Sequence, residues 1–101
     1  MRRGEVWRYE PVIARAGQST LRLVVSADSI NADDALPTVY VMQVVETDPG
    51  SLLAVRIGDL GWAFALLVDR PVRKRLTDRV GAATVEEMEQ VDAALRATLE
   101  L

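Results

Sequence analysis

The chain has 101 residues, of which 50% are apolar and 27% are charged, and its formal net charge is −3. This size and composition fit one domain over residues 1–101 with a largely aliphatic core. Cysteine and histidine are both absent, which excludes disulfides, thiolate nucleophiles, zinc sites built on Cys or His and imidazole acid–base catalysis. Any catalysis therefore depends on carboxylates, Arg, Ser, Thr or Tyr, and we expect no metal and no cofactor.

No targeting or membrane segment is visible in the sequence. The apolar runs are all shorter than the roughly 18–20 residues that cross a bilayer. Met1, Arg2 and Arg3 lead into a mixed, strand-like segment and not into the apolar core of a signal peptide. We therefore expect a cytoplasmic protein with no membrane partner.

Five segments have the alternating or β-branched pattern of strands, and short polar connections separate them. The adjacent Val24 and Val25 indicate a strand that is covered on both faces. Residues 47–50, Thr-Asp-Pro-Gly, have the order of a tight turn, so the strands on either side form a hairpin. The polar stretch 26–37 is predicted to be a connection with one helical turn at Asp33–Leu36. The expected strands are Gly4–Glu10, Leu21–Val25, Val39–Val45, Leu52–Ile57 and Trp62–Val68.

The last segment changes to a helical period. Thr84 followed by Glu87 is a capping-box pattern, which marks the start of a helix. Apolar residues then recur at spacings of three and four, at Val85, Met88, Val91, Leu95 and Leu99. The pattern predicts an amphipathic helix over Val85–Leu99 that covers one face or the mouth of the sheet. The expected fold class is α+β, a small curled antiparallel sheet of five strands with a C-terminal amphipathic helix.

A run of basic residues follows the last predicted strand. Residues 70–79 hold Arg70, Arg73, Lys74, Arg75 and Arg79 against a single acid. Guanidinium groups bind phosphate in a bidentate manner, and several cations together resist screening better than one, so this run can grip a nucleic-acid backbone. The alternative is a solvated turn that pairs with acidic residues of the last helix.

Three further features allow both a functional and a structural interpretation. Arg22 alternates with apolar residues inside a strand, so it either faces solvent or lines a polar groove. Thr47 either places a hydroxyl at the edge of a groove or serves only to form the turn. Three aromatic side chains either stack on exposed RNA bases or anchor the core: Trp7, Tyr9 and Trp62.

Three stretches of the chain match one known sequence pattern. Residues 1–7 read Met-Arg-Arg-Gly-Glu-Val-Trp, and residues 23–28 read Leu-Val-Val-Ser-Ala-Asp, with Asn31 shortly after. Residues 75–95 run from Arg-Leu-Thr-Asp-Arg-Val-Gly to Val-Asp-Ala-Ala-Leu. Together they resemble the opening strand, the second-strand motif and the C-terminal signature of the MazF/PemK family of bacterial toxin endoribonucleases. The resemblance spans residues 1–101.

This resemblance implies a small curled sheet of the SH3-like barrel type, as in the MazF and CcdB toxins, and a homodimer. It also implies a cognate antitoxin whose extended tail occupies the RNA groove. The implied activity is a metal-independent cleavage of single-stranded RNA, in which the substrate's own 2′-hydroxyl attacks the phosphate. An Arg can stabilise the charged phosphorane, and a Thr hydroxyl can position it.

The residues that would carry this chemistry are displaced along two strands. The family's usual Arg-Pro aligns with Thr20 and Leu21, and its usual Thr at the end of the third strand aligns with Val45. Arg22 and Thr47 lie two residues beyond the aligned Arg and Thr positions, and a shift of two residues keeps a side chain on the same face of a strand. We therefore take Arg22 and Thr47 as the catalytic candidates. The candidates for the grip on the RNA backbone are Arg70, Arg73 and Arg75.

The alternative is a catalytically weak or inactive MazF-like binding protein that acts through protein contacts. A fold persists when its site is lost, because function resides in the site. A gyrase-poisoning role of the CcdB type is disfavoured, since the Trp-Gly-Ile ending of those toxins is replaced here by Leu99-Glu100-Leu101. An adjacent gene for a short antitoxin would favour a toxin, and an isolated gene would favour the inert protein.

Overall fold

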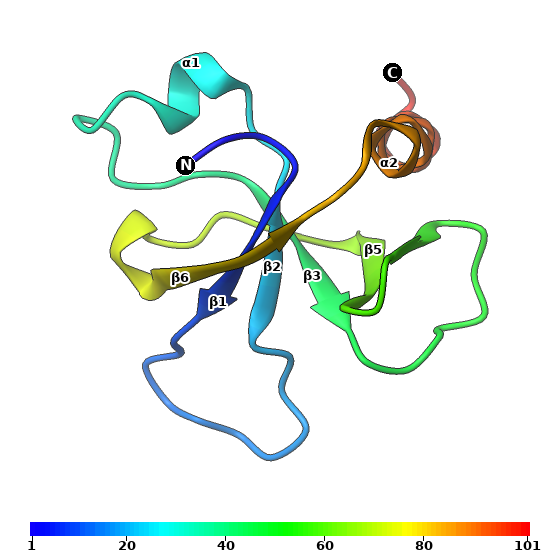
Figure 1. Cartoon of the computed structure of the whole chain (residues 1–101), viewed down its shortest axis with the longest axis horizontal. Coiled ribbons are helices and arrows are strands. Elements are labelled where there is room, and N and C mark those ends of the chain that lie inside the picture. Colours follow the sequence, from blue (N-terminus) through cyan, green and yellow to red (C-terminus); the bar gives the residue numbers. More distant parts are fainter.

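The computed structural model describes residues 1–101 as a curled antiparallel sheet of six strands with a long C-terminal helix (Figure 1). The strands are β1 (Glu5–Tyr9), β2 (Leu21–Val24), β3 (Val41–Val45), β4 (Ala54–Ile57), β5 (Gly61–Asp69) and β6 (Leu76–Ala82). The helices are α1 (Asp28–Asn31), the 3-10 turn η1 (Arg73–Arg75) and α2 (Val85–Leu99). The predicted α+β class is confirmed, and neither α-helix is long and apolar enough to span a bilayer.

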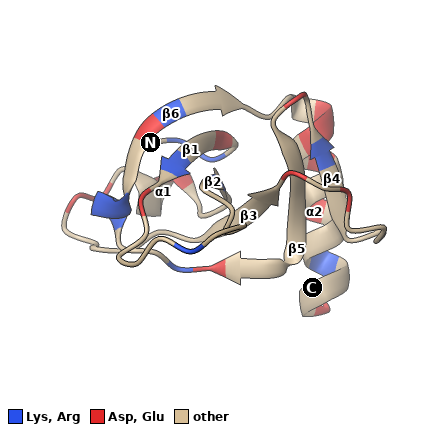
Figure 2. Cartoon of the chain, turned by 90° about the horizontal axis from the view of Figure 1, so that it is seen from below, with Lys and Arg blue, Asp and Glu red and all other residues tan.

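The strands lie in the order β4-β5-β3-β2-β1-β6, and all neighbours are antiparallel. In Figure 2, β6 and β5 lie on opposite sides of the curl. The sheet curls, as expected for the SH3-like type, but it is not closed, because β4 and β6 remain as its edges. Leu23 and Val24 of β2 point to opposite faces and are both fully buried. The expectation that this strand is covered on both faces is therefore confirmed.

The prediction of five strands was wrong, because β6 lies in the segment that was interpreted as a basic turn. This strand pairs with β1 through partners such as Trp7 with Arg79 and Val6 with Gly81. Only Leu76 of its seven residues is buried, since β6 is an edge strand with two register shifts against β1. An edge strand needs little apolar alternation, so the hydrophobic pattern does not reveal it.

Two apolar clusters lie on the two faces of the sheet. The larger cluster joins one face to α2 and includes Val6, Leu23, Met42 and Val91. The smaller cluster lies on the other face, and Trp7 and Tyr9 pack against its members Val24, Val39, Val41 and Leu76. The interpretation of Trp7 and Tyr9 as core anchors is therefore confirmed.

Helix α2 begins and ends where the sequence predicts. The Thr84 side chain accepts a hydrogen bond from the Glu87 backbone N–H at 3.1 Å, and the Glu87 carboxylate accepts one from the Thr84 N–H at 2.8 Å. The second Glu87 oxygen accepts the Gly58 N–H at 2.7 Å, which ties the start of α2 to the β4–β5 turn. The middle of the apolar stripe packs against β4 and β5, whereas Val85 and Leu99 at its ends are exposed.

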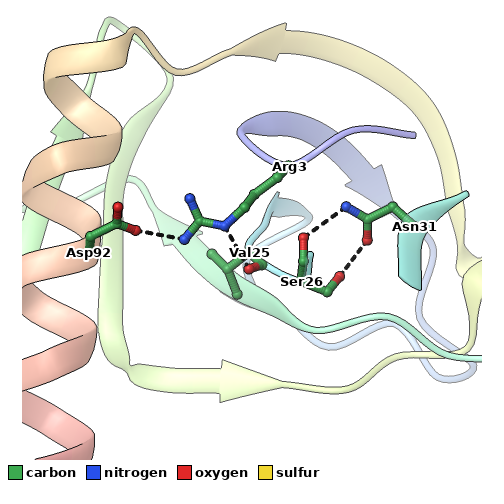
Figure 3. A network of polar contacts seen from close by, with 5 residues as sticks. All are labelled: Arg3, Val25, Ser26, Asn31 and Asp92. Atoms are coloured by element: carbon green, nitrogen blue, oxygen red, sulfur yellow. Dashed lines mark hydrogen bonds and ion pairs between the residues drawn. The ribbon is translucent and has the colours of Figure 1, made fainter. Parts of the chain in front are cut away.

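The predicted helical turn at Asp33–Leu36 was wrong, and the short helix α1 lies at Asp28–Asn31. The Asn31 side chain is buried and donates to the Ser26 carbonyl at 2.8 Å, and the Ser26 hydroxyl donates to the Asn31 amide oxygen (Figure 3). At the predicted position Asp33 forms a turn instead, because its carboxylate accepts the Ala35 N–H at 3.0 Å.

Arg3 connects the N-terminal segment to both α-helices, and Figure 3 shows its contacts with Asp92 and Val25. Its guanidinium forms an ion pair with Asp92 of α2 at 2.6 Å and donates through Nε to the Val25 carbonyl at 3.0 Å. Its backbone N–H donates to the Asp28 carboxylate at 2.6 Å. This backbone hydrogen bond is the main reason that the pKa of Asp28 lies below its ordinary value, and the Asn31 side chain adds to the effect.

Candidate functional site

A pocket of about 750 Å³ lies where β2 begins and β3 ends. Leu21 of β2 pairs with Val44 of β3, so the loop before β2 and the residues after β3 meet at one end of the sheet (Figure 1). Leu60 closes the pocket from the β4–β5 turn. The remaining lining residues are Gly17, Gln18, Ser19, Thr20, Gln43, Val45, Glu46 and Thr47. The pocket therefore includes Thr20 and Val45, which align with the family's usual Arg and Thr positions.

The polar groups of this pocket are mostly unengaged. Ser19 is the exception, because its hydroxyl donates to the Val44 carbonyl, which holds the loop against β3. Five other polar side chains line the pocket and make no hydrogen bond within the chain: Gln18, Thr20, Gln43, Glu46 and Thr47. Glu46 is the only charged residue in the lining, which contains no Lys or Arg.

Arg22 lies outside the lining and is only 1% exposed, so the interpretation that it faces solvent was wrong. Its Nη1 donates to the carbonyls of Ser19 at 2.9 Å and Leu21 at 3.0 Å, and the guanidinium carbon lies 4.4 Å from the centre of the Tyr9 ring. Its Nε is buried and has no hydrogen-bond partner. Burial lowers the pKa of Arg22 below its ordinary value, and the neighbouring Tyr9 and Asp69 act in the opposite direction.

The two catalytic candidates are therefore not brought together in one pocket. Thr47 lines the pocket, whereas Arg22 is connected to it through two lining residues, Ser19 and Leu21. The Ser19 carbonyl and hydroxyl accept from Nη1 at 2.9 and 3.4 Å, and the Leu21 carbonyl accepts at 3.0 Å. The pairing register places Gln43 opposite Arg22. Gln43 is half-buried and lines the pocket, and no sequence pattern singles it out.

The basic run divides into residues with different roles. Arg73 donates to four carbonyl oxygens, those of Ile30 at 3.0 Å, Asn31 at 2.6 Å, Asp33 at 3.1 Å and Leu36 at 3.1 Å. Its guanidinium therefore holds the α1 segment against η1.

The other members of the run have more freedom. Arg70 and Lys74 are exposed, Arg75 is half-buried, and Arg79 pairs with Glu5 at 3.0 Å. None of the run lines the pocket, and η1 lies on the opposite side of the molecule from α2 (Figure 2). The alternative in which the run pairs with the acidic residues of α2 was therefore wrong.

A second arginine lies over the third aromatic residue. The guanidinium carbon of Arg56 is 4.3 Å from the centre of the Trp62 ring, and its Nε donates to the Gly58 carbonyl at 2.6 Å. Arg56 and Trp62 are direct partners across β4 and β5. No sequence pattern singles out Arg56, although the register of a hairpin can place an Arg directly opposite a Trp.

Solved structures share this fold over nearly the whole chain. An endoribonuclease in complex with its cognate antitoxin, from a mycobacterial species, is 22% identical, covers 100% of this chain and 96% of its own, and gives a TM-score of 0.84. A mycobacterial endoribonuclease is 23% identical with a TM-score of 0.82, over 100% of this chain and 92% of its own. MazF from Deinococcus radiodurans is 18% identical with a TM-score of 0.76, over 99% of this chain and 96% of its own.

These likenesses define the fold. No family model and no curated protein matches the chain. The chain has the fold of endoribonucleases, one of which was solved in complex with its cognate antitoxin. Within that class, its fold is that of MazF.

Proposed function

We propose that this chain is the toxin of a toxin–antitoxin pair and acts as an endoribonuclease on single-stranded RNA. The observation that carries the proposal is the full-length likeness of its fold to endoribonucleases, one of them bound to its antitoxin. The proposal includes a cognate antitoxin, a homodimer and a cytoplasmic location, with residues 1–101 as one domain. The antitoxin, the homodimer and the location are what the resemblance of the sequence to the MazF/PemK family implies.

The proposed reaction needs little covalent chemistry from the protein. The 2′-hydroxyl of one ribose loses its proton to solvent and its oxygen attacks the adjacent phosphorus, while the 5′-oxygen of the next nucleotide leaves and takes up a proton from solvent. The first fragment therefore ends in a 2′,3′-cyclic phosphate, and the second begins with a 5′-hydroxyl. The protein holds the phosphate in line and stabilises the charge that develops on it. We assign the charge stabilisation to Arg22, the positioning to Thr47 and the backbone grip to Arg70 and Arg75. Arg73, the third candidate for the grip, already donates to four carbonyl oxygens.

The geometry adds a condition to this assignment. Nη1 of Arg22 is engaged by two backbone carbonyls, while its Nε is free of hydrogen bonds. A phosphate that contacts the guanidinium must therefore do so through Nη2, the one nitrogen of the group that is neither hydrogen-bonded nor buried without a partner.

A second candidate function is a MazF-like binding protein that does not cleave RNA. The observation that favours it is the lining of the pocket, which offers one carboxylate and no cation. A carboxylate repels a phosphate, and nothing else in the lining offsets that repulsion.

Expression in a bacterial host tests the proposal, with growth and the integrity of total RNA measured after induction. The wild-type chain should arrest growth and fragment RNA, and co-expression of the cognate antitoxin should restore both. Arg22→Lys and Thr47→Val should each reduce fragmentation at least tenfold. Arg96→Ala is the matched control, because Arg96 is exposed on α2 and far in sequence from the pocket.

Thermal unfolding of each purified variant separates loss of activity from loss of fold. Growth arrest with intact RNA would favour the non-cleaving binding protein. Normal growth and intact RNA at a high level of folded protein would contradict a toxin of either kind.

A further inference from the structure

The β4–β5 hairpin carries a fixed cation on its outer face. Val55 and Ile57 point into the core, so Arg56 between them points outward and is exposed. Its guanidinium carbon lies 4.3 Å from the centre of the Trp62 ring, and its Nε donates to the Gly58 carbonyl at 2.6 Å. The plane of the guanidinium is therefore held by the indole and by the backbone. Its remaining edge, which carries Nη1 and Nη2, makes no hydrogen bond within the chain.

Arg56 also has no acidic partner. The chain forms two ion pairs, which join Arg3 to Asp92 and Arg79 to Glu5. The charge of Arg56 is therefore not neutralised within the chain. The planar Nη1–Nη2 edge of a guanidinium matches two oxygens of a phosphate, so Arg56 presents an edge that is suited to a phosphate.

The pairing register places this cation beside the pocket between β2 and β3. Arg56 is the direct partner of Trp62, and Trp62 is the direct partner of Val45, which lines the pocket. Directly paired residues point to the same face of a sheet, so these three side chains share one face. The guanidinium extends from β4 over β5, and neighbouring strands lie about 5 Å apart, so it stands close to β3 and to the pocket.

Another arginine lies on the other side of the pocket. The pocket lies between β2 and β3, in the middle of the strand order, whereas β4 and β6 are the edges. Arg75 directly precedes β6, and its carbonyl accepts the Glu10 N–H at 2.8 Å, just after the end of β1. An RNA strand that passes the pocket from the β6 edge to the β4 edge would therefore meet Arg75 on one side and Arg56 on the other.

We propose that the Nη1–Nη2 edge of Arg56 binds one phosphate of the RNA backbone on the β4 side of the pocket, with Trp62 as its positioning residue. The inference rests on the proposed action on RNA. The lining of the pocket holds one carboxylate and no cation, so a phosphate beside it needs a positive charge from outside the lining. Arg56 provides that charge in the orientation it already has in the free chain, which lowers the entropy lost on binding. The contact grips the backbone at a phosphate other than the one that reacts.

The salt dependence of RNA binding tests the inference. The probe is a fluorescently labelled 2′-O-methyl hexauridylate, which lacks the attacking hydroxyl and stays intact, and its affinity for the full chain is measured over a series of KCl concentrations. Each phosphate contact on a single strand contributes about 0.7 to the slope of log affinity against log salt concentration. Arg56→Ala should therefore lower the magnitude of this slope by about 0.7 and weaken binding about three- to tenfold at low salt. Arg96→Ala removes the same charge from an exposed site on α2 and should change neither quantity.

Substitutions at Trp62 separate the positioning of the guanidinium from its charge. Trp62→Phe keeps an aromatic face beneath Arg56 and should bind the probe within about twofold of the wild type. Trp62→Leu keeps the charge but removes that face, so the slope should stay and the affinity should fall about threefold. Equal affinities of these two variants would remove Trp62 from the positioning role. Circular dichroism of each variant confirms that it is folded.

The cleavage reaction provides a second readout. A grip on a phosphate that does not react is equally strong before and during the reaction. Arg56→Ala should therefore raise KM by about the factor that it weakens binding of the probe, and it should leave kcat unchanged. A fall in kcat with an unchanged KM would place Arg56 at the reacting phosphate and would refute the grip.

The contrary outcomes in binding are distinct. An unchanged slope for Arg56→Ala, with or without a loss of affinity, would overturn the phosphate contact and leave the proposed action on RNA standing. No binding of the probe by the wild type at millimolar concentration would overturn both. Displacement of the probe by inorganic phosphate beyond the effect of ionic strength, in the wild type and not in Arg56→Ala, would show that Arg56 takes free phosphate and would overturn the contact with RNA.

Discussion

Gly61→Ala is the substitution that the fold should tolerate least. Gly61 has a φ of +134°, which side chains other than glycine rarely adopt. An added Cβ would lie 3.1 Å from Val44 Cγ1 and 3.2 Å from the Val45 carbonyl carbon, and it would overlap the Val45 carbonyl oxygen. Unstrained carbon contacts lie at about 3.5–4.0 Å, so β5 must move away from β3 at the wall of the pocket.

The matched control is Gly58→Ala, because it isolates the cost of the backbone conformation. Gly58 has a φ of +51°, and nothing lies within 4 Å of an added Cβ. That change should lower the free energy of unfolding by about 1–2 kcal/mol, the usual cost of a left-handed residue. Gly61→Ala adds a backbone overlap to a less accessible φ, and it should cost at least about 3 kcal/mol.

Thermal and urea unfolding followed by circular dichroism measure this difference. A domain of this size loses about 4–8 °C of Tm for each kcal/mol, so Gly61→Ala should lower the Tm by at least about 12 °C. Gly58→Ala should lower it by about 4–16 °C, less than Gly61→Ala does in the same buffer. Equal losses for the two variants would refute the reasoning, because they would show that the close approach of β5 to Val45 adds nothing.

Two further predictions concern the polar contacts around α1. The pKa of Asp28 is lowered in the folded chain, chiefly by the Arg3 N–H, so its contribution to stability is present above the unfolded value of about 3.9 and is lost as the pH falls below it. The Tm of Asp28→Asn should therefore fall less steeply than that of the wild type between pH 4 and pH 2, and parallel curves would contradict this linkage. Arg73→Ala leaves four carbonyl acceptors without their donor and should lower the free energy of unfolding in urea by about 1–3 kcal/mol, whereas Arg70→Ala at an exposed site should change it by less than about 0.5 kcal/mol. Equal stability of these two arginine variants would show that Arg73 is as free as Arg70.

Local patterns predicted much of the fold, because they depend on contacts between neighbours in the sequence. The capping box and the three-to-four spacing gave α2 with its observed ends, Val85 and Leu99. The alternating and β-branched patterns within the segments predicted β1 to β5 to within about two residues at each end. Strand β6 was not predicted, because it is exposed and paired on one edge only. Its place in the sheet depends on its pairing with β1 and not on an apolar pattern of its own.

The site was less predictable, because its geometry depends on where side chains point after folding. Arg22 was singled out by its place among apolar residues, but its burial under Tyr9 and its bonds to the backbone have no sequence signal. The same holds for Arg73, whose charge suggested phosphate and whose partners are four carbonyl oxygens. Gln43 and Glu46 are recognised as site residues only from the structure, in which the start of β2 and the end of β3 form a pocket.

The central claim is that the folded chain cleaves RNA through the substrate's own 2′-hydroxyl. The most direct measurement is incubation of the purified protein with a long single-stranded RNA in EDTA, followed by analysis of the fragment ends. We expect fragments with 5′-hydroxyl ends at a few preferred sequences, and we expect these fragments to be lost when Arg22 is replaced by Lys. Intact RNA at a large molar excess of folded protein would contradict the claim and favour the protein that acts by binding alone.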